Sequence, residues 1–190
     1  VSPGRSRATL RRHRDNHHVR TPKELCMSSA AASNPNASLT PRDTFIQPGE
    51  TAPDFILKDQ TKADWRLSEA LKKGDVVLCF YPLDFSPVCT TEMKCANDEF
   101  ARWTSKGATV VGISCDSFFV HEAWAASLGL KQTLLADMHR QVCKAYGIYW
   151  PDLNVSGRGT VIVGSNGKVK WTQRREIKDA MKFDDVLAML

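Results

Sequence analysis

The chain has 190 residues, of which 42% are hydrophobic and 25% charged, as in an ordinary globular protein. This length fits one domain that buries a core without disulfides or metals. No apolar run approaches the roughly 18 residues of a membrane span, so we expect no membrane association. The net charge of +5 comes from residues 1–26, which hold seven basic and two acidic side chains, while the remainder balances 19 against 19. The basicity belongs to a terminal segment and does not predict nucleic-acid binding.

The first 47 residues show no sustained periodicity and are rich in Arg, His, Ser, Asn and Pro. We predict a disordered basic extension over residues 1–47 and a single domain over residues 48–190. The Arg-rich, acid-poor composition permits an organellar transit peptide, but no apolar stretch indicates a secretory signal. The alternative is an inert tail, with translation beginning at Met27. We therefore expect a cytoplasmic protein, with organellar targeting as the other possibility.

From residue 48 onward, strand-like and helix-like patterns alternate. The predicted elements, in chain order, are a hairpin at 55–57 and 65–67, a short helix ending at 71, a strand at 76–81, a helix from 89, a strand at 109–114, a helix at 119–128, a strand at 133–135, a helical segment at 139–146, a hairpin at 160–163 and 169–171, and an amphipathic helix ending at 190. This order predicts an α/β fold with a mixed central sheet flanked by helices.

Cys89 lies where a predicted strand gives way to a predicted helix. The hydrophobic run 76–81 stops at Pro82, and from Cys89 onward the apolar residues follow helical spacing: Met93, Ala96, Phe100 and Trp103. The cysteine therefore falls in the first turn of a helix. Free N–H groups and the positive end of the helix dipole favour an anion there, so we expect a reactive thiolate.

The other cysteines do not suggest a secreted disulfide framework, because they fall in strand-like and helix-like segments of a mid-sized chain. Cys79 and Cys115 are predicted to be small buried apolar residues inside strands. Cys89 and Cys95 lack the Cys-x-x-Cys spacing of common zinc sites, so no metal site is expected. His121 and His139 are predicted to lie on helix surfaces.

The run Pro82-x-x-x-Ser86-x-x-Cys89 resembles the Pro-x-x-x-Thr/Ser-x-x-Cys signature of peroxiredoxins. Three further segments resemble that family in the same order along the chain: 49–55, 111–117 and 158–163. Within the family, residues 85–92 are most similar to the bacterioferritin-comigratory-protein and AhpE-like branch.

The resemblance implies a thioredoxin-like sandwich and a thiol-dependent peroxidase with an antioxidant role. Such an enzyme reduces hydrogen peroxide and small organic hydroperoxides through a cysteine sulfenic acid, here at Cys89, without metal, haem or flavin. A thioredoxin-like protein or a small thiol would be its reductant, and the chain would be a monomer or homodimer.

The resemblance also assigns roles around the thiol. Ser86 would hydrogen-bond the peroxide, although most relatives carry Thr at this position, and Pro82 would shield the sulfur from water. Arg158 would favour the thiolate and stabilise the charge that develops on the departing oxygen. Read without the resemblance, Ser86 is a turn residue, Pro82 ends a strand and Arg158 is a surface ion-pair partner. Glu92 either orients Arg158 or complements the helix dipole.

How Cys89 is regenerated is left open by the sequence. Some relatives form a disulfide with a cysteine five residues later, but Cys95 is six residues away. Six helical residues rise about 9 Å and rotate about 240°, whereas a disulfide needs Cα atoms within about 7 Å. Cys95 therefore points to the outer face, and pairing would require unwinding. Cys95, Cys143 and an external thiol remain the three candidates.

Two other functions use the same thiol. A thioredoxin-like disulfide oxidoreductase would need a Cys-x-x-Cys pair, but Val88 and Glu92 occupy the relevant positions. A peroxide sensor would be oxidised once and wait, whereas a peroxidase turns over.

Overall fold

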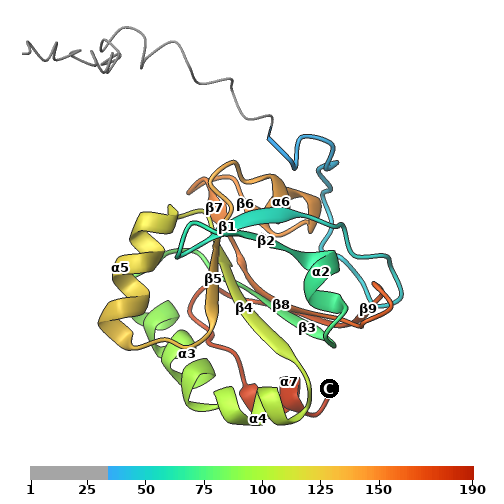
Figure 1. The fold of residues 1–190 in the computed structure, drawn as a ribbon. Coiled ribbons are helices and arrows are strands. Elements are labelled where there is room, and N and C mark those ends of the chain that lie inside the picture. Colours follow the sequence, from blue (N-terminus) through green and yellow to red (C-terminus); the bar gives the residue numbers. More distant parts are fainter. Residues whose placement is uncertain (1–33) are drawn as a thin grey trace, which may run out of the picture. The chain divides into compact units, whose positions relative to one another are not determined.

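The computed structural model describes residues 34–190, which form a central sheet with helices on both faces (Figure 1). The seven strands of the sheet run in the order β2-β1-β5-β4-β3-β8-β9. The strands are β1 (Ile56–Asp59), β2 (Asp64–Arg66), β3 (Val76–Phe80), β4 (Thr109–Ser114), β5 (Thr133–Ala136), β6 (Tyr149–Trp150), β7 (Val155–Ser156), β8 (Arg158–Val163) and β9 (Val169–Arg175). The helices are α2 (Leu67–Leu71), α3 (Pro87–Asp98), α4 (Phe100–Ser105), α5 (Phe118–Leu128), α6 (Gln141–Ala145) and α7 (Phe183–Leu187).

The sheet is mixed, as predicted. Strands β3, β4 and β5 run parallel, while β8 pairs antiparallel with β3 and with β9, and β1 pairs antiparallel with β5. The carboxyl ends of β3, β4 and β5 therefore meet at one edge of the sheet, where α/β proteins commonly place their functional groups. The two predicted hairpins, β1–β2 and β8–β9, are confirmed.

Each face of the sheet buries its own hydrophobic core, because side chains alternate along a strand. In β3, Val76, Leu78 and Phe80 point into one core, where α2 and α6 pack. Val77 and Cys79 point into the other core, with residues of α3, α4, α5 and α7. Figure 1 shows α2 and α5 on opposite sides of the sheet. Cys89 belongs to the second core, so the candidate thiol is anchored by packing.

Three details differ from the sequence-based prediction. The single helix expected after Cys89 is two helices, because the backbone at Glu99 (φ −83°, ψ 3°) leaves the α-helical region between α3 and α4. The two-residue strands β6 and β7 were not predicted, since two residues are too few for a periodic pattern. Cys115 follows the end of β4 and is half-buried, so its prediction as a buried strand residue was wrong, whereas Cys79 is buried inside β3 as predicted.

The domain begins before the predicted boundary at residue 48. Residues 34–47 belong to the same compact unit as the sheet. Ile46 is wholly buried and Phe45 nearly so, and the Asn36 side chain donates to the carbonyl of Ile56 (2.6 Å) and accepts from its N–H (2.9 Å). Two large apolar residues in a polar stretch are too few to give a periodic signal. For this reason the sequence pattern assigned residues 34–47 to the disordered extension. The predicted disorder of residues 1–33 lies outside the described residues.

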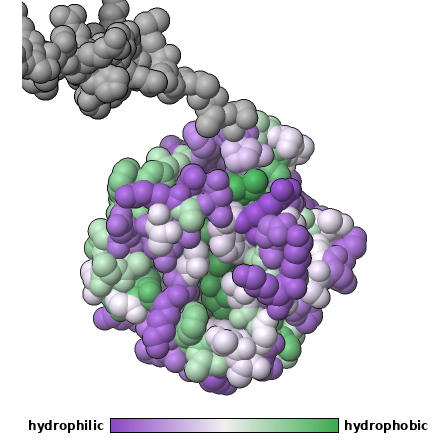
Figure 2. Space-filling view, in the orientation of Figure 1, coloured by the Kyte–Doolittle hydropathy of each residue, from purple (hydrophilic) through white to green (hydrophobic). Residues whose placement is uncertain are grey.

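Within residues 34–190, no helix is both long and apolar enough to cross a bilayer. Hydrophilic residues are spread widely over the face seen in Figure 2, with smaller apolar areas between them.

We predict that a chain beginning at residue 48 is less stable than one beginning at residue 34. Burying a large apolar side chain contributes about 1.5–3 kcal/mol, and the shorter chain loses Phe45, Ile46 and the Asn36 hydrogen bonds. Urea unfolding of both chains measures the difference. Equal midpoints would show that residues 34–47 contribute nothing to the fold.

Candidate active site

The sulfur of Cys89 is held in the first turn of α3, as predicted. Pro87 occupies the first helical position, which suits a residue without an N–H. Ser86 precedes it with extended backbone angles (φ −71°, ψ 147°), and its carbonyl accepts the N–H of Thr90 (2.9 Å). Cys89 itself has no exposed surface. The thiol therefore faces the interior rather than solvent.

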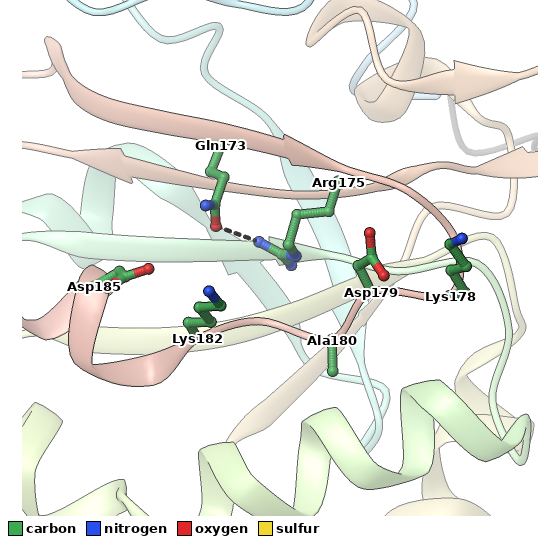
Figure 3. Close-up of a pocket in the computed structure, with 7 residues that line it drawn as sticks. All are labelled: Gln173, Arg175, Lys178, Asp179, Ala180, Lys182 and Asp185. Carbon is green, nitrogen blue, oxygen red and sulfur yellow. Dashed lines mark hydrogen bonds between the residues drawn. The ribbon is translucent and has the colours of Figure 1, made fainter.

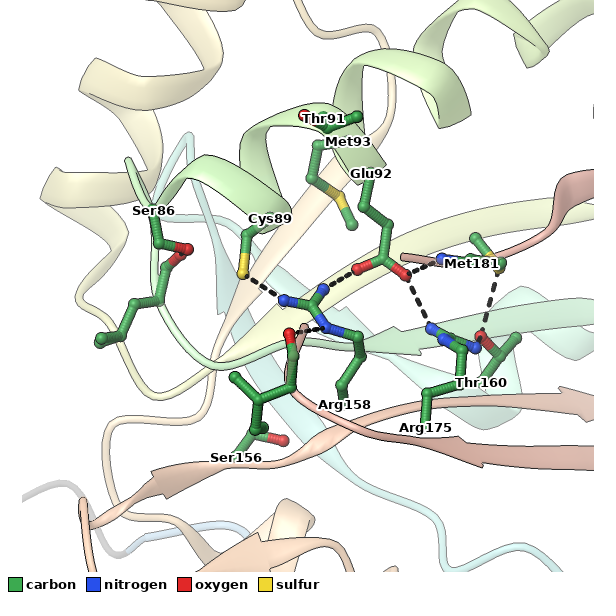
Figure 4. Close-up of polar contacts among 12 residues, drawn as sticks. Ser86, Cys89, Thr91, Glu92, Met93, Ser156, Arg158, Thr160, Arg175 and Met181 are labelled. Carbon is green, nitrogen blue, oxygen red and sulfur yellow. Dashed lines mark hydrogen bonds and ion pairs between the residues drawn. The ribbon is translucent and has the colours of Figure 1, made fainter. Parts of the chain in front are cut away.

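Arg158 is the direct polar partner of this sulfur. Its Nη2 donates to Cys89 Sγ at 3.1 Å, and its Nε donates to the carbonyl of Ile177 at 3.0 Å (Figure 4). Arg158 is the first residue of β8, which begins two residues before the predicted strand at 160–163, and it is only 1% exposed. The surface ion-pair interpretation of Arg158 is therefore wrong. Because the guanidinium is fixed at several of its N–H groups, its orientation toward the sulfur is set in advance.

Glu92 lies one turn after Cys89 and joins two arginines. Its carboxylate accepts from Arg158 Nη1, from Arg175 Nη2 (2.7 Å) and from the backbone N–H of Met181 (3.1 Å). Glu92 is 1% exposed, so all these contacts are shielded from water. Of the two interpretations open from the sequence, the contact with Arg158 is present, and a solvated charge complementing the dipole does not describe this buried side chain.

Arg175 was missed by the sequence reasoning. It pairs directly with Arg158 across the β8–β9 ladder, which is why both guanidiniums reach the same carboxylate. Its Nη1 also donates to Thr160 Oγ1 at 2.9 Å. The available signal was the predicted hairpin itself: extending its second strand to residue 175 places this arginine opposite Arg158.

Ser86 and Pro82 flank the thiol in the loop between β3 and α3. The Ser86 hydroxyl donates to the carbonyl of Leu83 at 2.9 Å, and within the described residues it makes no hydrogen bond to Cys89. Donation to Leu83 leaves the oxygen lone pairs of Ser86 free to accept. Pro82 is buried and follows the last residue of β3 by two positions. Figure 4 shows the side chains of Ser86 and Cys89 in the same turn.

A buried cluster of polar side chains around Asp84 holds the loop between β3 and α3 in place. Tyr81 Oη donates to Asp84 Oδ1 (2.7 Å), and His121 Nδ1 lies 2.7 Å from Asp84 Oδ2. The backbone N–H of Asp84 donates to Asp116 (2.9 Å). Burial, followed by the nearby Asp84 carboxylate, raises the pKa of Tyr81 well above its ordinary value, so its hydroxyl stays a donor. The cluster ties the loop to β4 and α5.

The prediction that His121 lies on a helix surface was wrong, because the residue is 0% exposed. The helical pattern placed it on α5 but could not show that Asp84, 37 positions earlier, approaches that face. His139 is exposed as predicted, but it lies in the turn before α6 and not on a helix.

The two other cysteines considered as partners of Cys89 lie apart from its polar network. Cys95 is exposed and points away from the core that contains Cys89, as the helix geometry predicted. Cys143 is buried in the core on the opposite face of the sheet. Burial raises the pKa of Cys79 to about 12, so that thiol is unreactive.

A cavity of about 540 Å³ opens beside Arg175 and is lined by Gln173, Arg175, Lys178, Asp179, Ala180, Lys182 and Asp185 (Figure 3). Cys89, Ser86 and Arg158 are not among its lining residues. The cavity therefore reaches the polar network at Arg175 but does not open onto the sulfur of Cys89, so a substrate in it would not contact the thiol.

Comparison with known proteins gives one consistent result. A sequence profile described as the AhpC/TSA family matches residues 48–172. Peroxiredoxin Q from the chloroplast of Sedum lineare is 34% identical over 85% of this chain and 88% of its own length. Alkyl hydroperoxide reductase E of Mycobacterium tuberculosis is 30% identical over 77% of this chain and 99% of its own. The crystal structure of the peroxidoxin BcpB from M. tuberculosis superposes with a TM-score of 0.70 at 30% identity, covering 76% of this chain and 96% of that one.

We predict that Asp84→Asn lowers stability and slows oxidation of Cys89. The amide places a donor where the carboxylate had only acceptors, and a buried polar group left without its partner costs about 1–3 kcal/mol. Urea unfolding and the stopped-flow rate of Cys89 oxidation by hydrogen peroxide measure the two effects. Asp152→Asn, at an exposed position, is the matched control, and an Asp84→Asn enzyme that equals this control would contradict the proposed support of the loop.

Proposed function

We propose that Cys89 is the peroxide-reducing residue of this chain, which belongs to the AhpC/TSA family of peroxiredoxins and is a thiol-dependent peroxidase. The observation that carries this proposal is the contact of 3.1 Å between Arg158 Nη2 and Cys89 Sγ inside a buried, ion-paired network. Five of the six cysteines fall within residues 34–190, and of these five only Cys89 accepts a hydrogen bond from a guanidinium.

The charges around Cys89 support a thiolate. Arg158 and Arg175 carry two positive charges and Glu92 one negative charge, so the buried network is left with one positive charge. A thiolate at Cys89 neutralises it. The attraction between these charges is strong because the groups are buried, and the protein interior screens Coulombic attraction less than water does. Glu92 is then a positioning residue that holds Arg158 against the sulfur.

The reaction moves the negative charge from the sulfur to the departing oxygen. The thiolate attacks one peroxide oxygen, the O–O bond breaks, and sulfur becomes a sulfenic acid while the other oxygen leaves as water or an alcohol after taking a proton. Arg158 stabilises the negative charge that develops on the departing oxygen. Ser86 accepts a hydrogen bond from the peroxide O–H through lone pairs that its bond to Leu83 leaves free. Pro82 presents no N–H to compete for the thiolate.

Because the enzyme is a peroxiredoxin, its substrate is a peroxide and its reductant a thiol or a thioredoxin-type protein. The folded α3 helix favours an external thiol as the group that resolves the sulfenic acid, since Cys95 is exposed on the side opposite Cys89. Pairing with Cys95 requires the first two turns of α3 to unwind. Pairing with Cys143 is disfavoured because the sheet separates the two side chains.

The environment of the protein is a separate proposal. Peroxiredoxin Q of Sedum lineare is chloroplastic, and the basic residues of segment 1–26 are compatible with organellar targeting, so we propose an organelle as the alternative to the cytoplasm. We further propose a monomer or homodimer that binds neither nucleic acid nor membrane, since the basic charge is confined to that segment.

We predict that Cys89→Ser abolishes peroxide consumption and that Arg158→Lys lowers kcat/KM roughly 10²-fold, because one preorganised donor is lost. A thioredoxin-coupled or dithiothreitol-coupled peroxide assay measures both. Arg102→Lys, at an exposed arginine, should retain full activity. Turnover that survives in Cys89→Ser would overturn the assignment, and a single round of oxidation in the wild type would indicate a sensor.

We predict that Cys95→Ser oxidises at the wild-type rate and that dimedone traps a sulfenic acid at Cys89 equally in both proteins. The reason is that Cys95 belongs to neither the polar network nor the core around Cys89. Mass spectrometry of the labelled peptides provides the measurement. A peptide linking Cys89 to Cys95 in the wild type, with dimedone labelling restricted to Cys95→Ser, would instead show that α3 unwinds during the cycle.

A further inference from the structure

A second pair of thiols lies near the carboxyl edge of the parallel strands, outside the Cys89 network. The sulfurs of Cys115 and Cys143 are 3.9 Å apart, although 28 positions separate the residues. Cys115 directly follows β4, and Cys143 lies in α6. A disulfide has an S–S length of about 2.05 Å, so the two sulfurs would have to approach each other by about 2 Å to join.

The two thiols differ in their access to solvent. Cys115 is half-buried, whereas Cys143 has no exposed surface. A small oxidant therefore meets Cys115 first. Hydrogen bonding to Cys115 and then burial raise the pKa of Cys143 well above its ordinary value. Cys143 is therefore kept as a thiol, protected from direct oxidation, until its neighbour has reacted.

A carboxylate lies against this pair. Asp137 follows β5, is 1% exposed, and accepts the backbone N–H groups of Val142 (3.2 Å) and Cys143 (2.8 Å). Its oxygen and the two sulfurs all lie within 4.8 Å of one another. Burial raises the pKa of Asp137, so it takes up a proton more readily than an exposed aspartate would. It is placed to receive the proton that Cys143 must lose on attack.

We propose that Cys115 and Cys143 form a second redox-active pair, which closes to an intramolecular disulfide when the enzyme meets excess peroxide. Cys115 first reduces a peroxide, giving a sulfenic acid and water or an alcohol. The sulfur of Cys143 then attacks the sulfur of Cys115, and its proton passes through Asp137 to the hydroxyl of the sulfenic acid, which leaves as water. Two electrons pass from the two sulfurs to one peroxide, and an external dithiol returns them.

The same three groups could instead hold a thiophilic cation, and the contacts favour the disulfide. Both carboxylate oxygens of Asp137 already accept backbone N–H groups. Structural zinc sites use four protein ligands, and within residues 34–190 only three such groups gather here. A disulfide between the two sulfurs needs no fourth ligand.

The test uses the full chain carrying Cys89→Ser and Cys95→Ser, so that neither the proposed catalytic thiol nor its nearest partner contributes. The protein is treated with diamide or with excess hydrogen peroxide, alkylated and digested with trypsin. We expect the peptides 107–131 and 141–144 to be recovered linked, with the alkylation of both cysteines lost and then restored by dithiothreitol. Since diamide oxidises thiols without any peroxidase activity, this result is independent of whether Cys89 is the catalytic residue.

Two variants in the same background serve as controls. Cys143→Ala should abolish the link and leave Cys115 reactive with dimedone after peroxide. Cys115→Ser, at a half-buried position at the edge of the core, should give the same loss of the link. Full alkylation of both cysteines after diamide would overturn the proposal. So would one equivalent of zinc that survives gel filtration, blocks the link and is lost in Cys143→Ala, because that result would assign the three groups to a metal site.

Discussion

The site depends on one buried carboxylate. Glu92 holds Arg158 and Arg175 together in the interior, where neither guanidinium could otherwise remain without a counter-charge. Removing one partner of such a buried set typically costs about 3–5 kcal/mol. The same carboxylate accepts the N–H of Met181, so the segment that follows β9 is fixed by the group that orients the arginine. Stability and reactivity are thus coupled: the network that neutralises the buried charges also leaves one positive charge facing the sulfur.

The sheet topology explains why residues far apart in the sequence share one site. Parallel pairing of β3 with β4 and of β4 with β5 brings their carboxyl ends to one edge. The loop after β3 leads to Cys89, and Asp116 after β4 accepts the backbone N–H of Asp84 in that loop. The antiparallel pairing of β8 with β3 then delivers Arg158 to the same place, because its register puts Gly159 opposite Phe80 at the end of β3.

Local patterns were sufficient for most of the longer elements and for the placement of Cys89 in the first turn of a helix. The strand ending before Pro82, the helix that begins at Pro87 and the β8–β9 hairpin all follow from periodicity and turn residues. Contacts between distant segments were not accessible in this way. His121 is on the predicted helix, yet its burial against Asp84 depends on how α5 packs on the sheet. Phe45 and Ile46 likewise become core residues only through tertiary contacts, which the polar and aperiodic sequence around them does not predict.

The two thiol centres of this chain have opposite electrostatic environments. Cys89 accepts a hydrogen bond from the guanidinium of Arg158, and its proposed reaction with peroxide rests on this positive charge. Cys143 faces a buried carboxylate and a second thiol, which keep it protonated. On the two proposals made for these thiols, peroxide at low concentration is consumed at Cys89, and the Cys115–Cys143 pair reacts only when that capacity is exceeded. A single fold thus separates two oxidation events by the sign of the charge placed beside each sulfur.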